Sequence, residues 1–196
     1  MAVPTVKLSG TALSGYRDTP PSIAARRVLA FVPRDVRLGR LPPAPAATPP
    51  LRFGDYWSPP AGWTPPETVD YSTRASASIS RMYTNDRLGS CVIADRAHSV
   101  GVWTAADPDS GGEVLPTDAE VEREYHTICG PGDNGCVIRS VLDTAVRRGL
   151  TFAGKPHRID GYVSVDTRDL AQVRAASLLF GCLCFGVSYQ SSWSSR

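Results

Sequence analysis

The residues best suited to chemistry in this 196-residue sequence lie between positions 85 and 98, where a turn rich in Asn, Asp and Gly ends at a single cysteine, Cys91. After Cys91, apolar side chains recur at helical spacing at positions 94, 97, 100 and 105. A helix that begins at a cysteine points free backbone N–H groups and the positive end of its dipole at the sulfur, and both favour the thiolate. The segment therefore predicts a nucleophilic cysteine on the first turn of a partly buried helix. The alternative is a small buried hydrophobe without chemistry, the commoner role of an intracellular cysteine.

The order Asn85, Gly89, Ser90, Cys91, followed by an apolar helix that contains alanine, resembles the nucleophile segment of papain-like cysteine peptidases. The resemblance implies that Cys91 is the catalytic nucleophile, preceded by the family's Gly-Ser pair as Gly89 and Ser90. Asn85 stands six residues before Cys91, where the family has a Gln whose amide donates to the oxyanion hole. Asn carries the same donor on a shorter side chain. The family's aromatic residue after the cysteine is Val92 in this chain.

Two further segments carry the same resemblance. The family has a short helix that ends in Cys, a loop to a Gly-Cys pair and a helix that closes with Gly-Leu; Cys129, Gly135-Cys136 and Gly149-Leu150 match this order. The family's extra cysteine three residues before the nucleophile is Leu88 here, so its disulfides are not carried over. Five cysteines, an odd number, without a signal-peptide pattern favour reduced thiols.

Histidine is the residue type that the family's reaction needs as a base, with an Asn to orient it. In the family both lie on strands downstream of the last strand expected in this chain. His98 lies seven residues after Cys91 and would stand about 10 Å along the same helix, too far for a hydrogen bond. His126 and His157 match no catalytic position of the family. The sequence also resembles uncharacterised papain-type domains of actinobacteria and their phages, which have a His at the end of this helix.

The resemblance implies an α+β, papain-like fold with a helical lobe over about 80–150 and a partial β-rich lobe over about 157–190. In the helical lobe, Thr117 and Glu120 form a capping-box pattern that predicts a helix from this point. Asp133 or Asn134 is expected to cap a third helix over 136–148, with Gly149 at its C-terminus.

The tail of the chain changes its hydrophobic period. Residues 159–165 predict a strand, Asp166 or Thr167 is expected to cap a following helix, and residues 181–189 predict a buried strand with two cysteines as packing residues. A β lobe of this size would leave strand edges unpaired, so completion by another chain is an expectation.

The N-terminal 50 residues predict a basic, Pro-rich arm, and residues 51–196 the papain-like domain. The arm has seven Lys and Arg residues against two Asp residues, a net charge of +5, which leaves −3 for the remainder of a chain whose total is +2. This asymmetry favours docking on a protein partner or an assembly, with nucleic acid as a weaker alternative and an ordinary solvated arm as another. Between residues 51 and 66, four aromatic rings favour a segment that wraps the domain: Phe53, Tyr56, Trp57 and Trp63.

These features predict a non-catalytic structural or docking module of the papain-like type, for example a component of a phage particle. The alternative is an active cysteine peptidase or thiol acyl-transferase completed by segments absent from this chain. No cofactor is expected. A zinc site of Cys129 and Cys136 with His126 or His157 is disfavoured, because a spacing of seven lies outside the usual two to four. The absence of a long apolar run or an export signal predicts a cytoplasmic or virion location without membrane contact.

Overall fold

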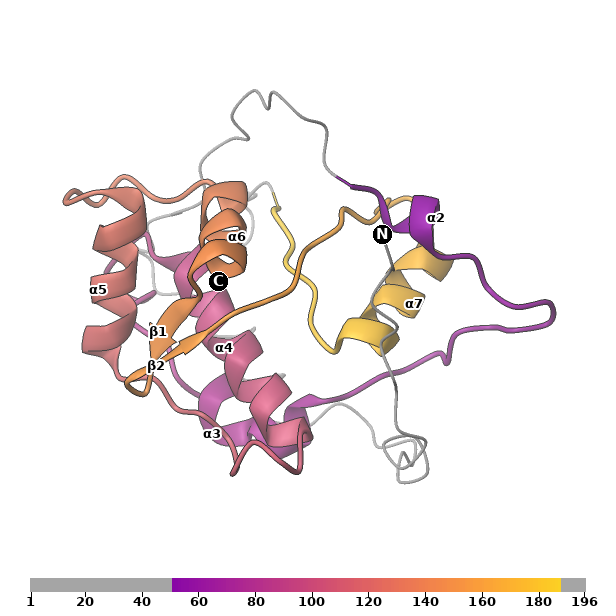
Figure 1. Ribbon diagram of the computed structural model, residues 1–196, viewed down its shortest axis with the longest axis horizontal. Coiled ribbons are helices and arrows are strands. Elements are labelled where there is room, and N and C mark those ends of the chain that lie inside the picture. The colour runs from indigo at the N-terminus through magenta and orange to yellow at the C-terminus, as the bar shows by residue number, and fades with distance from the viewer. Residues whose placement is uncertain (1–50, 188–196) are drawn as a thin grey trace, which may run out of the picture.

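The computed structural model describes residues 51–187, and the expected arm and the last residues of the tail lie outside that part. Helices and one two-stranded sheet make a mixed α+β fold, as the sequence predicts (Figure 1). The elements are α2 (Phe53–Tyr56), a 3-10 turn (Ser72–Ala75), α3 (Ser76–Ile79), α4 (Cys91–Ala106), α5 (Asp118–Cys129), α6 (Ile138–Arg147), β1 (Leu150–Phe152), β2 (Lys155–His157) and α7 (Leu170–Phe180).

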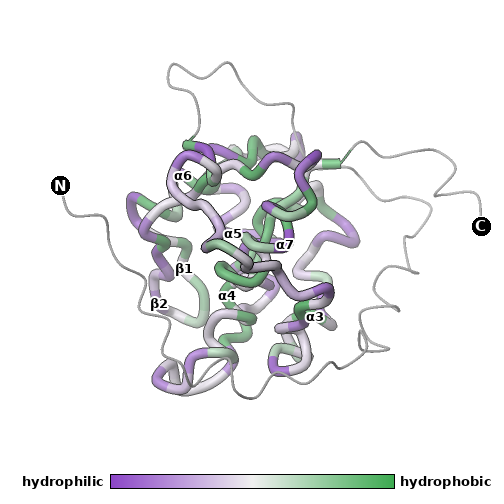
Figure 2. The backbone as a smooth tube through the Cα atoms, turned by 90° about the vertical axis from the view of Figure 1, so that its right-hand side faces the viewer, coloured by the Kyte–Doolittle hydropathy of each residue, from purple (hydrophilic) through white to green (hydrophobic). Residues whose placement is uncertain are grey.

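Helix α4 is the central element. In Figure 1, α5 and α6 lie on one side of it, and α2 and α7 lie on the other. Its small apolar residues Ala94 and Ala97, together with Ile93 and Val100, are buried, and this allows neighbours to approach from both sides. Apolar stretches of the backbone gather along α4 at the centre of the molecule (Figure 2). The helix predicted to begin at Cys91 is therefore confirmed.

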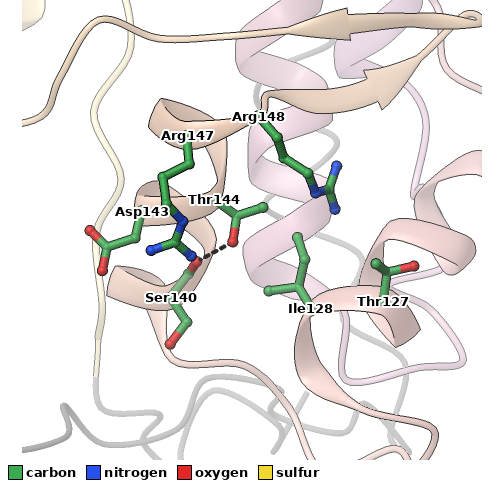
Figure 3. Close-up of a pocket in the computed structure, with 7 residues that line it drawn as sticks. All are labelled: Thr127, Ile128, Ser140, Asp143, Thr144, Arg147 and Arg148. Atoms are coloured by element: carbon green, nitrogen blue, oxygen red, sulfur yellow. Dashed lines mark hydrogen bonds between the residues drawn. The ribbon is translucent and has the colours of Figure 1, made fainter.

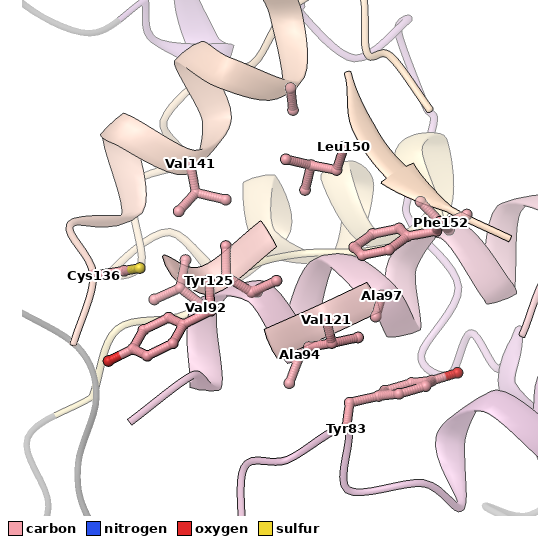
Figure 4. Close-up of a cluster of buried hydrophobic side chains, with 13 residues drawn as sticks. Tyr83, Val92, Ala94, Ala97, Val121, Tyr125, Cys136, Val141, Leu150 and Phe152 are labelled. Carbon is pink, nitrogen blue, oxygen red and sulfur yellow. The ribbon is translucent and has the colours of Figure 1, made fainter. Parts of the chain in front are cut away.

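The main core is formed by α4, α5, α6 and the sheet (Figure 4). Helix α5 begins at the predicted capping box, because the Thr117 side chain accepts from the Glu120 N–H and the Glu120 carboxylate accepts from the Thr117 N–H. Val121 and Tyr125, one turn apart on α5, are fully buried in this core. The local signal alone was sufficient to predict this helix.

The third helix begins later than predicted and without the predicted cap. Helix α6 has Val137 as its N-cap, with no side-chain hydrogen bond there, and Asp133 is engaged elsewhere. The end of the helix is confirmed in substance. Gly149 has φ of +82°, and a Cβ at this position would lie 3.0 Å from the carbonyl oxygen of His157. Glycine is therefore required where the chain turns from α6 into β1.

The strands β1 and β2 form an antiparallel hairpin in which Leu150 pairs with His157 and Phe152 with Lys155. Its two-residue turn, Ala153 and Gly154, has φ of +49° and +72°. Turns with positive φ at both central residues match the twist of a hairpin. The sequence did not indicate this hairpin, because alanine is an unusual residue at such a position.

The strand predicted over 159–165 is wrong, and so is the strand predicted over 181–189 as far as residue 187, where the described part ends. Over 159–165 the chain forms only one isolated bridge, between Arg52 and Ser164, and residues 181–187 form no strand, with Val187 64% exposed. An alternating pattern becomes a strand only where a second strand supplies backbone hydrogen bonds. Helix α7 forms as expected, but Asp169 caps it through the N–H groups of residues 171 and 172, in place of Asp166 or Thr167.

The aromatic segment wraps the domain as predicted, except for one ring. Phe53 is buried against α7, and Trp57 and Trp63 pack around it, whereas Tyr56 is 63% exposed. Phe53, Trp57 and Trp63 form a second apolar cluster with Ala175 and Ala176 of α7. None of the described helices has the length and apolar character needed to span a bilayer.

Candidate functional site

Cys91 is the first residue of α4, and it is half-buried against the main core. The N-cap residue, Ser90, is fully buried, and its side chain does not cap the helix. Its hydroxyl instead pairs with the hydroxyl of Thr84 at 3.0 Å. No side chain caps the first turn of α4, where the N–H groups of Ile93 and Ala94 donate to the Ser90 carbonyl oxygen. The positive end of the helix dipole lies at Cys91.

The turn before Cys91 contains two non-glycine residues in the left-handed region, Tyr83 with φ of +50° and Thr84 with φ of +67°. Such a conformation costs about 1–3 kcal/mol per residue and persists only where the surroundings fix it. Tyr83 is buried with its hydroxyl 3.0 Å from the Ser78 hydroxyl, and the hydroxyl of Thr84 is held by Ser90. The turn that carries Asn85 is thus held by buried side chains on both residues.

Asn85 has a buried side-chain oxygen without a hydrogen-bond partner among the described residues. An amide can turn by 180° and present its NH₂ group at the same place. A buried amide end that lacks a partner costs free energy, about 1–3 kcal/mol, unless a further molecule binds it. This state is compatible with the oxyanion-donor role that the family resemblance implies for Asn85.

The loop that links α5 to α6 contacts this turn directly. The Gly89 N–H donates to Oδ1 of Asp133 at 2.6 Å, and the Tyr125 hydroxyl donates to the same oxygen at 2.9 Å. The Gly135 N–H in turn donates to the Tyr125 hydroxyl at 2.9 Å. Burial, Asp133 and the nearby Cys91 thiolate raise the pKa of Tyr125, although the Gly135 N–H opposes the rise. Sequence reasoning missed this contact because Asp133 also fits a helix-cap pattern.

Cys129 and Cys136 form a disulfide that closes this loop, with their Cα atoms 5.4 Å apart. The expectation of reduced thiols is wrong for this pair. The odd total of five cysteines argued against a disulfide framework, but it does not exclude one local pair flanked by glycines. Both sulfurs of the disfavoured zinc site are thus bonded to each other. Among residues 51–187 no group of three His, Cys, Asp or Glu side chains is arranged to hold a metal ion.

The remaining cysteines lie beside a charge pair on α4, formed by buried Arg96 and partly exposed Asp95. Arg96 is 7% exposed and donates to Asp95 at 2.5 Å, while its guanidinium stands 6.0 Å from the ring centre of Trp103. Burial raises the pKa of Cys182 to about 11 and that of Cys184 to about 12. The Cys91 thiolate is one of the charges that raise the pKa of Cys184. The sulfur of Cys91 therefore lies within electrostatic reach of the tail segment.

The three histidines of the described chain are engaged away from the start of α4. His98 packs on Tyr83 with ring centres 4.9 Å apart, and burial lowers its pKa. A ring nitrogen of His126 lies 3.1 Å from the Gly130 carbonyl, and one of His157 lies 3.1 Å from the Phe152 carbonyl. The structure does not bring any of them forward as a base for Cys91.

A surface pocket of about 590 Å³ lies between α5 and α6 (Figure 3). Arg147 and Arg148 line it together with Asp143 and small polar residues of the two helices. Arg148 is held by Glu124 through two hydrogen bonds of 3.2 and 2.7 Å. Neither Cys91 nor Asn85 lines this pocket, so it is separate from the candidate site.

Comparison of the chain with protein-family models, with curated proteins and with solved structures gives no match. The resemblance to papain-like peptidases therefore rests on the motif residues around Cys91 and Cys136. The four site residues predicted from the sequence lie on one continuous turn that leads into α4: Asn85, Gly89, Ser90 and Cys91.

Proposed function

We propose that this chain carries a papain-like thiol site for acyl transfer, with Cys91 as the nucleophile. The observation that carries the proposal is the position of a half-buried cysteine at the first residue of a 16-residue helix whose N-cap side chain is engaged elsewhere. The positive end of the helix dipole at this position stabilises a thiolate. The side-chain oxygen of Asn85, which has no partner among the described residues, gives additional support because the amide can turn and present its NH₂ group there.

In this proposal the Cys91 thiolate attacks an acyl carbon, a C–S bond forms, and the carbonyl electron pair moves onto oxygen. The Asn85 amide and the Cys91 N–H donate to that oxyanion. When the intermediate collapses, the bond to the leaving group breaks and the leaving group takes up a proton. Water then releases the acyl group from sulfur. The base and acid of these steps are supplied from outside residues 51–187, by the same chain or by another one.

The test measures how fast each free thiol is alkylated. Iodoacetamide is added at about pH 6.5, and peptide mass spectrometry follows Cys91 and Cys182 in the same sample. Cys182 serves as the internal control, because burial raises its pKa to about 11. We expect Cys91 to react at least tenfold faster, since the rate follows the thiolate fraction. A Cys91 that reacts no faster than Cys182 contradicts the proposal.

A second candidate function is a non-catalytic docking module, as part of a phage particle or another assembly. One argument for it is that all three histidines contact residues other than Cys91. Another is the net charge of +5 on residues 1–50, against −3 on the remaining residues. Stoichiometric association with a partner that survives Cys91→Ala and is lost on deletion of residues 1–50 supports docking. Loss of that association in Cys91→Ala contradicts it.

A further inference from the structure

The loop closed by the Cys129–Cys136 disulfide reaches across to the turn that carries Cys91. Asp133, in the middle of this loop, accepts from the backbone N–H of Gly89, which stands two residues before Cys91. The distance of 2.6 Å is that of a short, charge-assisted hydrogen bond. It links two segments that lie 44 residues apart in the sequence.

The loop is held firmly enough to position what it contacts. Tyr125, whose side chain is fully buried in the main core, donates to the same Asp133 oxygen and accepts from Gly135. Cys136 is 1% exposed, and its disulfide ties the end of the loop to the last residue of α5. The carboxylate of Asp133 thus belongs to the rigid helical part of the molecule and is held from two sides.

We propose that Asp133 is a positioning residue for the Cys91 thiol: by holding the Gly89 N–H it fixes the peptide units of Gly89 and Ser90 and hence the direction of the first turn of α4. This inference rests on the proposed function, because it concerns the reactivity of the same thiol. A negative charge near a thiol by itself opposes formation of the thiolate. Asp133 therefore acts through its hydrogen bond, and its charge works against the effect.

Because the hydrogen bond and the charge of Asp133 have opposite effects on the Cys91 thiolate, two variants of Asp133 can separate them. Asp133→Asn keeps an oxygen that can accept from Gly89 and from Tyr125, whereas Asp133→Ala keeps neither bond. We expect the Cys91 alkylation rate at about pH 6.5 to fall about tenfold in Asp133→Ala, the size associated with losing a hydrogen bond to a charged group. In Asp133→Asn the rate stays within about threefold of wild type, or rises because a charge has been removed. Asp109→Ala, which removes an exposed carboxylate in another loop, leaves the rate unchanged.

Two results overturn the positioning role. One is a Cys91 rate in Asp133→Ala equal to that of wild type. The other is an equal fall in the Ala and Asn variants, because Asn keeps the oxygen that accepts from Gly89 and the hydrogen bond would then not set the rate. The double variant Cys129→Ser/Cys136→Ser keeps Asp133 and opens the loop. We expect it to slow Cys91 in the same direction, and an unchanged rate removes the disulfide from the proposal.

Amide hydrogen exchange at Gly89 separates this proposal from the proposed function. We expect the Gly89 amide to be protected in wild type and in Asp133→Asn, and to exchange faster in Asp133→Ala, with unfolding curves checking that each variant folds. A wild-type Cys91 no more reactive than Cys182 overturns the proposed function. Unchanged Gly89 exchange in Asp133→Ala overturns the contact itself and leaves the proposed function standing.

Discussion

Single residues show how differently one chain can surround three free thiols. Cys91 is half-buried at a helix start, whereas Cys182 and Cys184 lie beside Arg96 and Asp95, where burial is the largest influence on both pKa values. The guanidinium of Arg96 lowers those two pKa values, but burial outweighs it. A thiol at pKa 11 or 12 holds its proton at neutral pH, so Cys182 and Cys184 act as packing groups there.

Alkaline pH is therefore expected to destabilise the fold through these two thiols. Their pKa rises from 9.0 in the unfolded chain to about 11 and about 12 in the fold, so the folded chain retains protons that the unfolded chain releases. The stabilisation is fully present below about pH 9 and is lost as the pH rises through the folded pKa values.

Urea unfolding at about pH 8 and about pH 10.5 checks this, with Cys182→Ala/Cys184→Ala as the comparison. The double variant should lose less unfolding free energy than wild type between the two pH values. The tyrosines with raised pKa values contribute equally to the pH dependence of wild type and of the double variant. Parallel losses in the two chains would refute the expectation.

Pairs of elements in this fold are matched by the size of single side chains, most closely where α4 meets α3. A Cβ added to Gly101, in the middle of α4, would lie 2.4 Å from the Ser78 hydroxyl oxygen and 2.5 Å from its Cβ. Ser78 cannot move freely, because it is fully buried, its N–H donates to Glu113 at 2.5 Å and its hydroxyl pairs with Tyr83. The glycine thus sets how closely the two helices pack.

Gly101→Ala should destabilise the protein although alanine is the better helix former by about 1 kcal/mol. Overpacking of this kind costs about 1–3 kcal/mol, and here the neighbour is fixed, so the steric cost outweighs the helix propensity. Urea unfolding should show a net loss of up to about 2 kcal/mol. Gly161→Ala is the matched control, because nothing lies within 4 Å of its added Cβ.

The double variant Gly101→Ala/Ser78→Gly tests the cause, since it removes the colliding Cβ. Its loss should be smaller than the sum of the two single losses. Additive losses would show that the contact with Ser78 does not limit position 101.

Over the whole molecule, two apolar clusters are joined by a few contacts across α4. The main core lies with α5, α6 and the sheet, and the second cluster lies with α2 and α7 (Figure 1). Trp103 on α4 donates from its ring N–H to the Phe180 carbonyl at 2.7 Å, and the Tyr71 hydroxyl donates to the Leu178 carbonyl at 2.8 Å. Few such contacts let the smaller cluster open while the larger one stays closed.

Phe53→Ala is expected to open the second cluster first. Phe53 is 3% exposed and stacks on Trp57 with ring centres 5.0 Å apart, and loss of a buried Phe costs about 3–5 kcal/mol. Amide exchange should speed up in α7 and stay slow in α5. Tyr56→Ala, on the same helix but 63% exposed, is the control. Equal acceleration in α5 and α7 would indicate a single cooperative unit instead.

Local signals in the sequence were sufficient for the four longer helices and for the turn that leads to Cys91, but not for the short helices α2 and α3 or for the caps of α6 and α7. The capping box at Thr117 and Glu120 and the spacing after Cys91 depend on neighbours within one or two turns. The placement of Asn85 and Cys91 on one turn could be predicted to the same extent, because the two residues belong to one continuous segment. The α+β class came from the family resemblance, and the strands that bear it out, β1 and β2, are not the ones that the sequence indicated.

The remaining features depend on contacts between distant segments. Asp133 bonds to Gly89 across 44 positions, and no pattern near Asp133 distinguishes that role from a helix cap. The tail strands failed for the same reason, because an apolar alternation at 181–187 cannot indicate whether a second strand lies beside it. The disulfide likewise depends on how α5 and the following loop approach each other.

The positions of the tryptophan rings make their fluorescence a probe of one part of the fold. Within residues 51–187 the three tryptophans, Trp57, Trp63 and Trp103, all lie at the second cluster or on its contact with α4, whereas the buried aromatics of the main core are Tyr and Phe. The fluorescence of these three rings will therefore follow the separation of α7 from α4, whereas Trp193 lies outside the described residues. This fluorescence will change little when the main core unfolds, and a tyrosine or far-ultraviolet signal is needed to follow that core.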